Sequence, residues 1–294
     1  MVFQPFDPAP PPFRRRFKAI PVRTLLPNLI TLLALCAGLT AIRLSIEGKL
    51  EWSLAAIVFA ALLDGIDGRI ARMLKGTSKF GAELDSLADF VNFGVAPGLM
   101  LYFWQLHELG NAGWIAAMVF AISGGLRLAR FNATMDDPNK PPFAANFFTG
   151  VPAPAGAITV LLPIYVAFLD LGRLPVAVTA AYTLLIAFLM VSRLPVFSGK
   201  TKRMRVPPEL VLPAFVAVIV FIALLIAYPW QVLSIGTVLY LLCLPLGYKS
   251  YRDQSRALEA ATPGGGEVTP SSPSPPLAAN MSEPPQDDRP ERLH

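Results

Sequence analysis

The sequence predicts an all-α protein: a polytopic membrane helix bundle of about eight transmembrane helices, with N and C termini both cytoplasmic. Of its 294 residues, 54% are hydrophobic and only 15% are charged, and the mean hydropathy is +0.52. Soluble domains usually carry about 25% charged residues. Apolar runs of about 20 residues, the length that crosses a hydrocarbon core of roughly 30 Å, recur along the chain. Lys and Arg are also distributed unevenly among the connections between these runs. Together these observations indicate a membrane protein.

The first four predicted spans alternate with short polar connections. The first follows the basic stretch RRRFKAIPVR, and the second ends in the polar sequence DGIDGR. The third begins among charged residues and becomes apolar at Phe90, and the fourth ends at LRLAR. From the length and hydropathy of these runs we expect helices near 26–46, 51–70, 84–106 and 113–131.

The last four predicted spans are more uniformly apolar. The sequence DLGR separates the fifth span from the sixth, and the basic stretch KTKRMR separates the sixth from the seventh. A Tyr-Pro-Trp sequence separates the seventh span from the eighth, as expected for a tight turn between two helices. We therefore expect helices near 149–169, 174–192, 209–228 and 231–248.

Basic residues mark one side of this bundle. They precede the first span and follow the second, fourth and sixth spans, whereas the opposite connections carry few bases. The positive-inside rule makes the basic side cytoplasmic. We therefore expect a multi-pass protein of the cell (inner) membrane with both termini in the cytoplasm.

Composition divides the chain into three parts. Residues 1–22 form a Pro-rich and basic N-terminal segment, and residues 23–252 form the transmembrane domain. Residues 253–294 are rich in Pro, Gly and Ser and predict a disordered cytoplasmic tail. The formal net charge of +5 is attributed to topology and anionic lipid headgroups. No nucleic-acid partner is expected, because no basic patch with interleaved aromatic residues is present in the sequence.

The stretch DGIDGRIARMLKGTSKFGAELDSLAD, residues 64–89, sets four aspartates in apolar surroundings. Asp64 and Asp67 are three residues apart, and Asp85 and Asp89 are four apart, so each pair shares one helical face. A carboxylate at the centre of a span costs about 2.5–3.5 kcal/mol on insertion scales, which argues for compensating cations. One alternative is structural pairing with nearby bases, namely Arg69, Arg72, Lys75 or Lys79.

Carboxylates that converge from two antiparallel helices repel one another unless divalent ions neutralise them. A site with oxygen ligands alone selects Mg²⁺, Mn²⁺ or Ca²⁺ over zinc. Glycines at 65, 68 and 81 would let a bulky ligand approach the helix backbone closely. The sequence therefore predicts a divalent-metal site near the cytoplasmic end of the second and third spans.

This stretch resembles the signature of the CDP-alcohol phosphotransferases, D-x2-D-G-x2-A-R-x8-G-x3-D-x3-D. All of its fixed positions are present: Asp64, Asp67, Gly68, Ala71, Arg72, Gly81, Asp85 and Asp89. Members of that family are integral membrane enzymes that transfer a phosphate-containing group from a CDP-linked donor to an alcohol and release CMP. The resemblance implies two divalent ions, Mg²⁺ or Mn²⁺, bound by Asp64, Asp67 and Asp85. It implies that Asp89 assists at the second metal and acts as the general base.

Candidates for binding the nucleotide and its phosphates come from the same two regions. The start of the first span, LLPNLITLLAL, is similar to the Pro-Asn and hydroxyl pattern that the family carries there, which implies roles for Asn28 and Thr31. For Asn28 the alternative is helix capping after a proline. The other candidates for contact with the nucleotide or its phosphates are Gly68, Arg72, Thr77 and Gly81.

Other segments of the sequence indicate which alcohol accepts the transferred group. The sequences DSLADFVNFGVAPGLMLY, GGLRLARFN, FFTGVPAPAGA and SRLPVFSGK resemble the CDP-diacylglycerol–serine O-phosphatidyltransferases. Asn92 departs from that resemblance, because Ser is expected there. Arg127 and Arg130, three residues apart at the end of the fourth span, are candidates for binding the acceptor carboxylate or a lipid-linked phosphate. Their alternative role is positive-inside anchoring, which is expected for at least one of them, and of the two we favour Arg130 as the ligand residue.

The function that the resemblance implies is metal-dependent transfer of a phosphatidyl group from CDP-diacylglycerol to L-serine, with release of CMP, by a membrane homodimer. One alternative is a sister enzyme that uses glycerol 3-phosphate, inositol, inositol phosphate or choline. A different class, a divalent-cation transporter, would need polar residues through the full membrane depth. The outer halves of these spans are almost purely apolar, which argues against that class.

Overall fold

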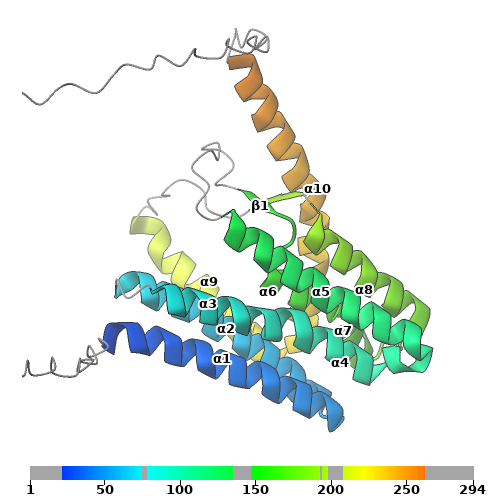
Figure 1. Ribbon diagram of the computed structural model, residues 1–294. Helices are drawn as coiled ribbons and strands as arrows, with labels where there is room; N and C mark the ends of the chain where they lie inside the picture. The colour runs from blue at the N-terminus through cyan, green and yellow to red at the C-terminus, as the bar shows by residue number, and fades with distance from the viewer. Residues whose placement is uncertain (1–21, 75–77, 135–146, 193, 198–207, 262–294) are drawn as a thin grey trace, which may run out of the picture. The chain divides into compact units, whose positions relative to one another are not determined.

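The computed structural model describes residues 22–74, 78–134, 147–192, 194–197 and 208–261 (Figure 1). Residues up to Asp253 form one compact unit, and the chain from Gln254 onward forms a second. The described part of the second unit is the helical end of α10. The bundle described below belongs to the first unit.

Two long antiparallel helices open the bundle. Helix α1, Val22–Ile46, and helix α2, Leu50–Met73, are joined by a turn at Gly48, whose φ of +75° favours glycine. The buried face of α1 carries small side chains at the positions Thr31, Ala34, Gly38, Ala41 and Ser45. Small side chains let α2 and the third span lie close to α1, which makes extensive contacts with both.

The turn between α1 and α2 is exposed and charged. Glu47 accepts hydrogen bonds from Arg43 at 2.7 Å and from Lys49 at 2.8 Å. The bonds from Lys49 and Arg43 lower the pKa of Glu47 below its ordinary value. These charges lie at the end of α1 opposite to Asn28 and Thr31, so they keep this turn in contact with water.

The third span is one helical run with a wider turn inside it. Helix α3, Lys79–Asp89, passes into a π-helical turn, η1, Phe90–Val95, and then into α4, Ala96–Trp104. Ser78 caps the start of α3, because its Oγ accepts a hydrogen bond of 3.0 Å from the Gly81 backbone N–H. The π-helical turn follows Asp89 directly. Such turns are frequent at functional sites.

The next helices pack against this run. The short 3₁₀ turn η2, Leu106–Leu109, leads into α5, Asn111–Ala133, which contacts η1, α4 and α8. Two glycines allow the close approach of α5 and η1: a Cβ atom added at Gly124 would lie 3.0 Å from the Cα atom of Gly94. Figure 1 shows α1, the run from α3 to α4, and α5 lying side by side.

The fifth predicted span is broken into two shorter helices. Helix α6, Ala153–Val160, ends at Leu161, and α7, Leu162–Phe168, begins with Pro163 in its first turn. Proline has no backbone N–H to donate to the preceding turn, so an unbroken helix is disfavoured here. The sixth span is α8, Val176–Val191, which packs along α5.

A small antiparallel ribbon and two terminal helices complete the fold. Strands β1, Phe147–Thr149, and β2, Pro195–Phe197, pair with Phe147 opposite Phe197. Helix α9, Pro208–Ala227, is apolar and exposed along its described length. Helix α10, Pro229–Ala261, packs on the core through Trp230, whose ring stacks on Phe168 with centroids 4.8 Å apart.

The prediction of an all-α membrane bundle is confirmed, and the ribbon is its one addition in the described ranges. Five helical runs are long and apolar enough to cross a membrane: Leu25–Ile46, Lys79–Trp104, Asn111–Ala133, Leu210–Ala227 and Pro229–Gly247. Helices α6 with α7, and α8, are shorter apolar segments at the predicted fifth and sixth spans. Helix α2 has sufficient length but carries the charged residues of the motif.

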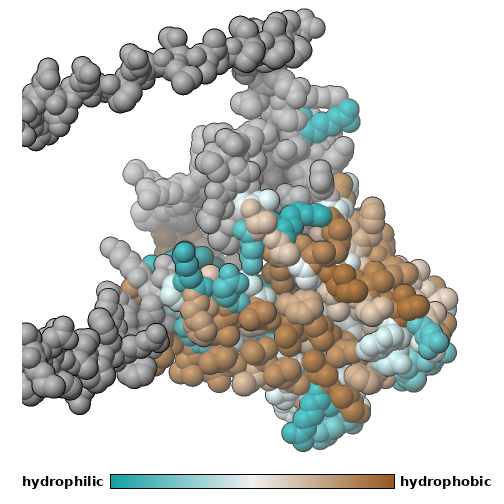
Figure 2. All heavy atoms as spheres, viewed as in Figure 1, coloured by the Kyte–Doolittle hydropathy of each residue, from teal (hydrophilic) through white to brown (hydrophobic). Residues whose placement is uncertain are grey.

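Figure 2 shows hydrophobic side chains over most of the coloured surface, with hydrophilic ones in separate clusters. The orientation of the termini stays a prediction.

Helix packing around Gly98 gives a test of this fold. A Cβ atom added at Gly98 would lie 2.9 Å from the backbone oxygen of Ala117 in α5. A backbone atom of a packed helix can move away only at a cost in free energy. We expect Gly98→Ala to lower the free energy of unfolding by about 1–3 kcal/mol through overpacking. Thermal unfolding of the purified protein in detergent measures this. Gly236→Ala in α10 is the matched control, because nothing lies within 4 Å of its added Cβ. Equal midpoints for the two variants would contradict this packing.

Candidate active site

Three aspartates converge as the motif predicts. Asp64 and Asp67 come from α2, and Asp85 comes from α3, and one carboxylate oxygen of each lies within 4.8 Å of the others. The spacing of three residues sets Asp64 and Asp67 on one face of α2, roughly two turns before the helix ends at Met73. Oxygen atoms at these separations suit a hard divalent cation.

Asp67 is the most enclosed of the three, with 3% of its surface exposed. Its Oδ2 accepts a hydrogen bond of 2.6 Å from Thr31 Oγ1 in α1, which ties the two helices together at the site. Its Oδ1 is buried and has no hydrogen-bond partner among the described residues. A buried carboxylate oxygen without a partner is unfavourable unless a cation binds it. The donor set therefore fits a divalent metal ion.

Asp89 lies beside this cluster and is not one of the three converging residues. Its side chain interacts directly with that of Asp64 and electrostatically with Arg127 of α5. This position, one turn further along the span than Asp85, is compatible with a proton acceptor next to the metal ligands. The role of Asp89 as a ligand to the second metal stays a prediction.

A pocket of about 250 Å³ adjoins the carboxylates. Helices α1, α2 and α3 line it with Pro27, Asn28, Thr31, Asp67, Gly68, Ala71, Arg72, Ser78, Gly81, Ala82 and Asp85. The structure therefore brings together five of the six residues predicted to contact the nucleotide or its phosphates. The sixth, Thr77, lies outside the described residues.

Within this pocket, Gly81 and Arg72 have distinct surroundings. A Cβ atom at Gly81 would lie 2.7 Å from Asn28 Oδ1, so a side chain there would displace the Asn28 amide from the pocket wall. Arg72 is exposed, and its guanidinium lies beside Gly68, where an added Cβ would be 3.9 Å from the Nη atoms. An exposed guanidinium at the edge of a pocket can bind a phosphate as it enters.

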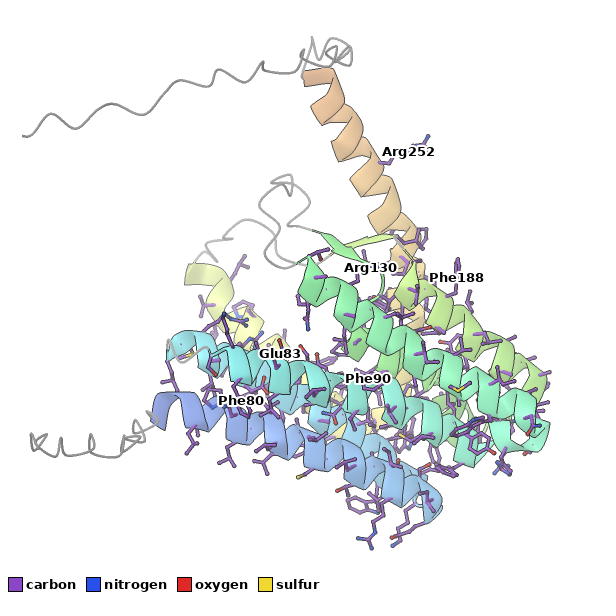
Figure 3. The ribbon with its side chains drawn as sticks, viewed as in Figure 1. Phe80, Glu83, Phe90, Arg130, Phe188 and Arg252 are labelled. Carbon is purple, nitrogen blue, oxygen red and sulfur yellow. The ribbon has the colours of Figure 1, made fainter. Side chains whose placement is uncertain are left out.

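The two arginines predicted to bind the acceptor have different environments. Arg127 is buried beside Asp89, and its guanidinium lies 5.6 Å from the centroid of the Phe131 ring. Arg130 Nη1 donates a hydrogen bond of 2.6 Å to the backbone oxygen of Val191 at the end of α8. Figure 3 shows Arg130 near the end of α5. Arg127 therefore faces the aspartates, whereas Arg130 fastens α5 to α8, and its acceptor role stays a prediction.

Two further polar residues were not among the predicted site residues, although the sequence marked Asn92 as a departure from the family resemblance. Asn92 of η1 is buried against Gly38 of α1, and both polar atoms of its amide have no partner among the described residues. Tyr240 of α10 interacts electrostatically with Arg127. A signal existed for Asn92, a polar residue three positions after Asp89 in an apolar run. No local signal marks Tyr240, because only tertiary packing brings it to the site.

Comparison with known proteins agrees with this geometry. The family model described as CDP-alcohol phosphatidyltransferase matches residues 24–194, and a second, described as CDP-alcohol phosphatidyltransferase 2, matches residues 209–245. The first match contains every predicted site residue and covers helices α1 to α8.

Several curated relatives share the same name, CDP-diacylglycerol--serine O-phosphatidyltransferase. The protein from Mycobacterium tuberculosis (strain CDC 1551 / Oshkosh) is 49% identical over 137 residues, which are 47% of this chain and 48% of the relative. The protein from Helicobacter pylori (strain J99) is 41% identical over 138 residues, 47% of this chain and 56% of the relative. The protein from Bacillus subtilis (strain 168) is 37% identical over 138 residues, 47% of this chain and 74% of the relative.

The chain therefore spans about half the length of the mycobacterial relatives that it matches. The match of the first family model is longer, because it covers more than half of the 294 residues and includes the complete aspartate motif. On the strength of this match and of the converging aspartates, the chain belongs to the CDP-alcohol phosphatidyltransferase family.

Proposed function

We propose that this protein is a CDP-diacylglycerol–serine O-phosphatidyltransferase, which transfers a phosphatidyl group from CDP-diacylglycerol to L-serine and releases CMP. The observation that carries the proposal is the convergence of Asp64, Asp67 and Asp85 beside a pocket lined by Asn28 and Arg72. Relatives across bacteria and an archaeon carry the name of this activity. Their names support L-serine as the acceptor.

The carboxylates would hold divalent cations, and Mg²⁺ or Mn²⁺ fits the oxygen-only donor set. Two bound ions would neutralise the charge of the donor pyrophosphate and of the departing CMP. The residues that would bind them are Asp64, Asp67 and Asp85, with Asp89 at the second ion. The unpartnered Oδ1 atom of Asp67 supports this assignment.

The donor pocket would position the CDP group. Thr31 holds the Asp67 carboxylate in place, and Asn28 lies against Gly81 on the opposite wall. Arg72, exposed at the pocket edge, would bind a donor phosphate through paired N–H groups. Because glycine stands at 68, a phosphate can approach the α2 backbone beside Arg72, whereas glycine at 81 leaves room for the Asn28 amide.

The reaction would then need one proton transfer and one displacement at phosphorus. Asp89 accepts the proton of the serine hydroxyl, and the serine oxygen forms a bond to the phosphorus that carries the diacylglycerol. The bond from that phosphorus to the bridging oxygen of CMP breaks, and CMP leaves with the electron pair. Arg127, buried beside Asp89, would bind the serine carboxylate and so orient the hydroxyl toward Asp89.

The apolar helices make this a multi-pass membrane protein. We further propose that it lies in the cell (inner) membrane with the aspartates facing the cytoplasm, as the basic connections favour. A homodimer is proposed from the family resemblance.

The acceptor assignment can be tested directly. The purified protein in detergent would receive CDP-diacylglycerol, Mn²⁺ and one candidate acceptor, with CMP release as the readout. We expect fast release with L-serine and little with glycerol 3-phosphate, inositol, inositol phosphate or choline, because Arg127 provides one buried cation for a carboxylate. Faster release with glycerol 3-phosphate or an inositol compound would assign the protein to a sister activity.

Metal removal tests the aspartate cluster. We expect EDTA to abolish CMP release, and excess Mn²⁺ or Mg²⁺ to restore it, because the pyrophosphate charge is otherwise not neutralised. Binding of Mn²⁺ to the protein without substrates, followed by electron paramagnetic resonance, gives a second readout. It should be weakened in Asp67→Asn and unchanged in Asp170→Asn, an exposed control. Full turnover in chelator would contradict the metal assignment.

Substitution separates the base from the metal ligands. We expect Asp89→Asn to lower turnover by about 10²–10⁴-fold, the usual contribution of a general base, while affinity for CDP-diacylglycerol in the presence of metal is kept. Asp64→Asn and Asp85→Asn should weaken donor binding as well, because they lie among the converging ligands. Donor affinity and single-turnover rates check both expectations. A near-normal rate for Asp89→Asn, or loss of donor binding as severe as in Asp64→Asn, would refute this division of roles.

A further inference from the structure

Arg127 is a buried cation that has no hydrogen bond or ion pair with any described residue. It is 8% exposed, and its Nε atom is buried with no hydrogen bond. Its guanidinium faces the Phe131 ring and interacts electrostatically with Asp89 and Tyr240. In the described part of the chain, the ion pairs within 4.0 Å are those of Glu47, so Asp89 does not pair with Arg127 directly. A buried guanidinium in this state favours an anionic ligand.

Helix α10 carries three buried hydroxyl groups, and the one on Tyr240 interacts electrostatically with Arg127. Ser234, Thr237 and Tyr240 follow one another at intervals of three residues, so they share one face of the helix. The hydroxyl oxygens of all three are buried and have no partner among the described residues. The neighbouring Leu239 and Leu242 are exposed, so the polar face points inward.

Tyr240 is the most informative of these residues. Ser and Thr hydroxyls in helices often bond to the backbone oxygen four residues earlier, so other rotamers could satisfy Ser234 and Thr237. A tyrosine hydroxyl is too far from its own helix backbone to do so. A buried phenol hydroxyl and a buried guanidinium Nε, neither with a partner among the described residues and both in groups that interact electrostatically, therefore indicate a shared ligand.

We propose that Tyr240 is an acceptor-specificity residue, whose hydroxyl binds the carboxylate of the amino-acid acceptor together with the Arg127 guanidinium. The proposal rests on the function proposed above and extends it to α10. The phenol O–H donates to one carboxylate oxygen, and guanidinium N–H groups donate to the other. The serine hydroxyl then points toward Asp89, which interacts electrostatically with the same Arg127 guanidinium.

The charge of this site favours a carboxylate over a second phosphate. One buried cation, Arg127, matches one negative charge. Arg130 is held at the end of α8, because its Nη1 atom donates to the Val191 and Ser192 backbone oxygens. The exposed Arg72 belongs to the donor pocket between α1, α2 and α3. In this proposal Arg127 therefore binds the acceptor carboxylate, and Arg72 binds a donor phosphate.

The test compares two conservative variants of the full chain in detergent, with CDP-diacylglycerol and Mn²⁺. We expect Tyr240→Phe to raise the KM for L-serine by about 10- to 100-fold, the loss expected for a hydrogen bond to a charged group, with the KM for the donor unchanged. Tyr182→Phe is the matched control, because the Tyr182 hydroxyl already donates to the Thr159 backbone oxygen at 2.8 Å. It should leave the KM for serine unchanged. If Tyr240→Phe does not fold, Tyr240→Met replaces it and should show the same rise.

Ethanolamine, which is serine without its carboxylate, separates recognition from a structural effect. We expect Tyr240→Phe to reduce the ratio of kcat/KM for serine to that for ethanolamine by about tenfold or more, because only serine loses a contact. An unchanged ratio, or an equal loss for both acceptors, would overturn the role of Tyr240 while leaving the proposed function intact. If the unmodified protein releases no CMP with serine, the proposed function fails, and this inference fails with it.

Discussion

The hydrogen bond from Thr31 to Asp67 links the apolar fold to its charged site. A carboxylate inside a helix bundle is unfavourable unless its oxygens have partners. Thr31 satisfies one oxygen of Asp67 and leaves the other directed away from any described partner. The bond also joins the N-terminal part of α1 to the C-terminal part of α2, where the pocket of about 250 Å³ lies. The same contact therefore stabilises the helix pair and orients a metal ligand.

This contact requires two helices to lie unusually close together. Small residues on the buried face of α1, including Ala34, Gly38 and Ala41, remove the bulk that would separate it from α2 and η1. At Gly38 the close approach brings the Asn92 amide against the α1 backbone. The packing face of α1 and the site thus belong to one continuous surface, so larger side chains on that face would also displace Asp67.

The sequence predicted the convergence of the aspartates well, because helical spacing and an antiparallel connection decide which faces meet. It could not predict the π-helical turn after Asp89, since hydropathy does not distinguish a π turn from an α turn. It favoured Arg130 over Arg127 as a ligand residue, because the bond that Arg130 donates to the Val191 backbone oxygen depends on the position of α8, which the sequence does not show. Tyr240 lies in the last helix, far along the chain from the motif, and only tertiary packing brings it to Arg127.

Arg72 is exposed, whereas Arg127 is buried, and this difference affects how water reaches the site. On the donor side Arg72 is exposed, so a charged nucleotide can enter from water without first losing all of its hydration. On the opposite side Arg127 and the hydroxyl of Tyr240 are buried, so bulk water is kept from the position that an acceptor would occupy. Water is itself a nucleophile toward a pyrophosphate, and its exclusion favours transfer to an alcohol over hydrolysis. If the acceptor binds at Arg127 as proposed, its buried position beside an open pocket would therefore favour transfer over hydrolysis.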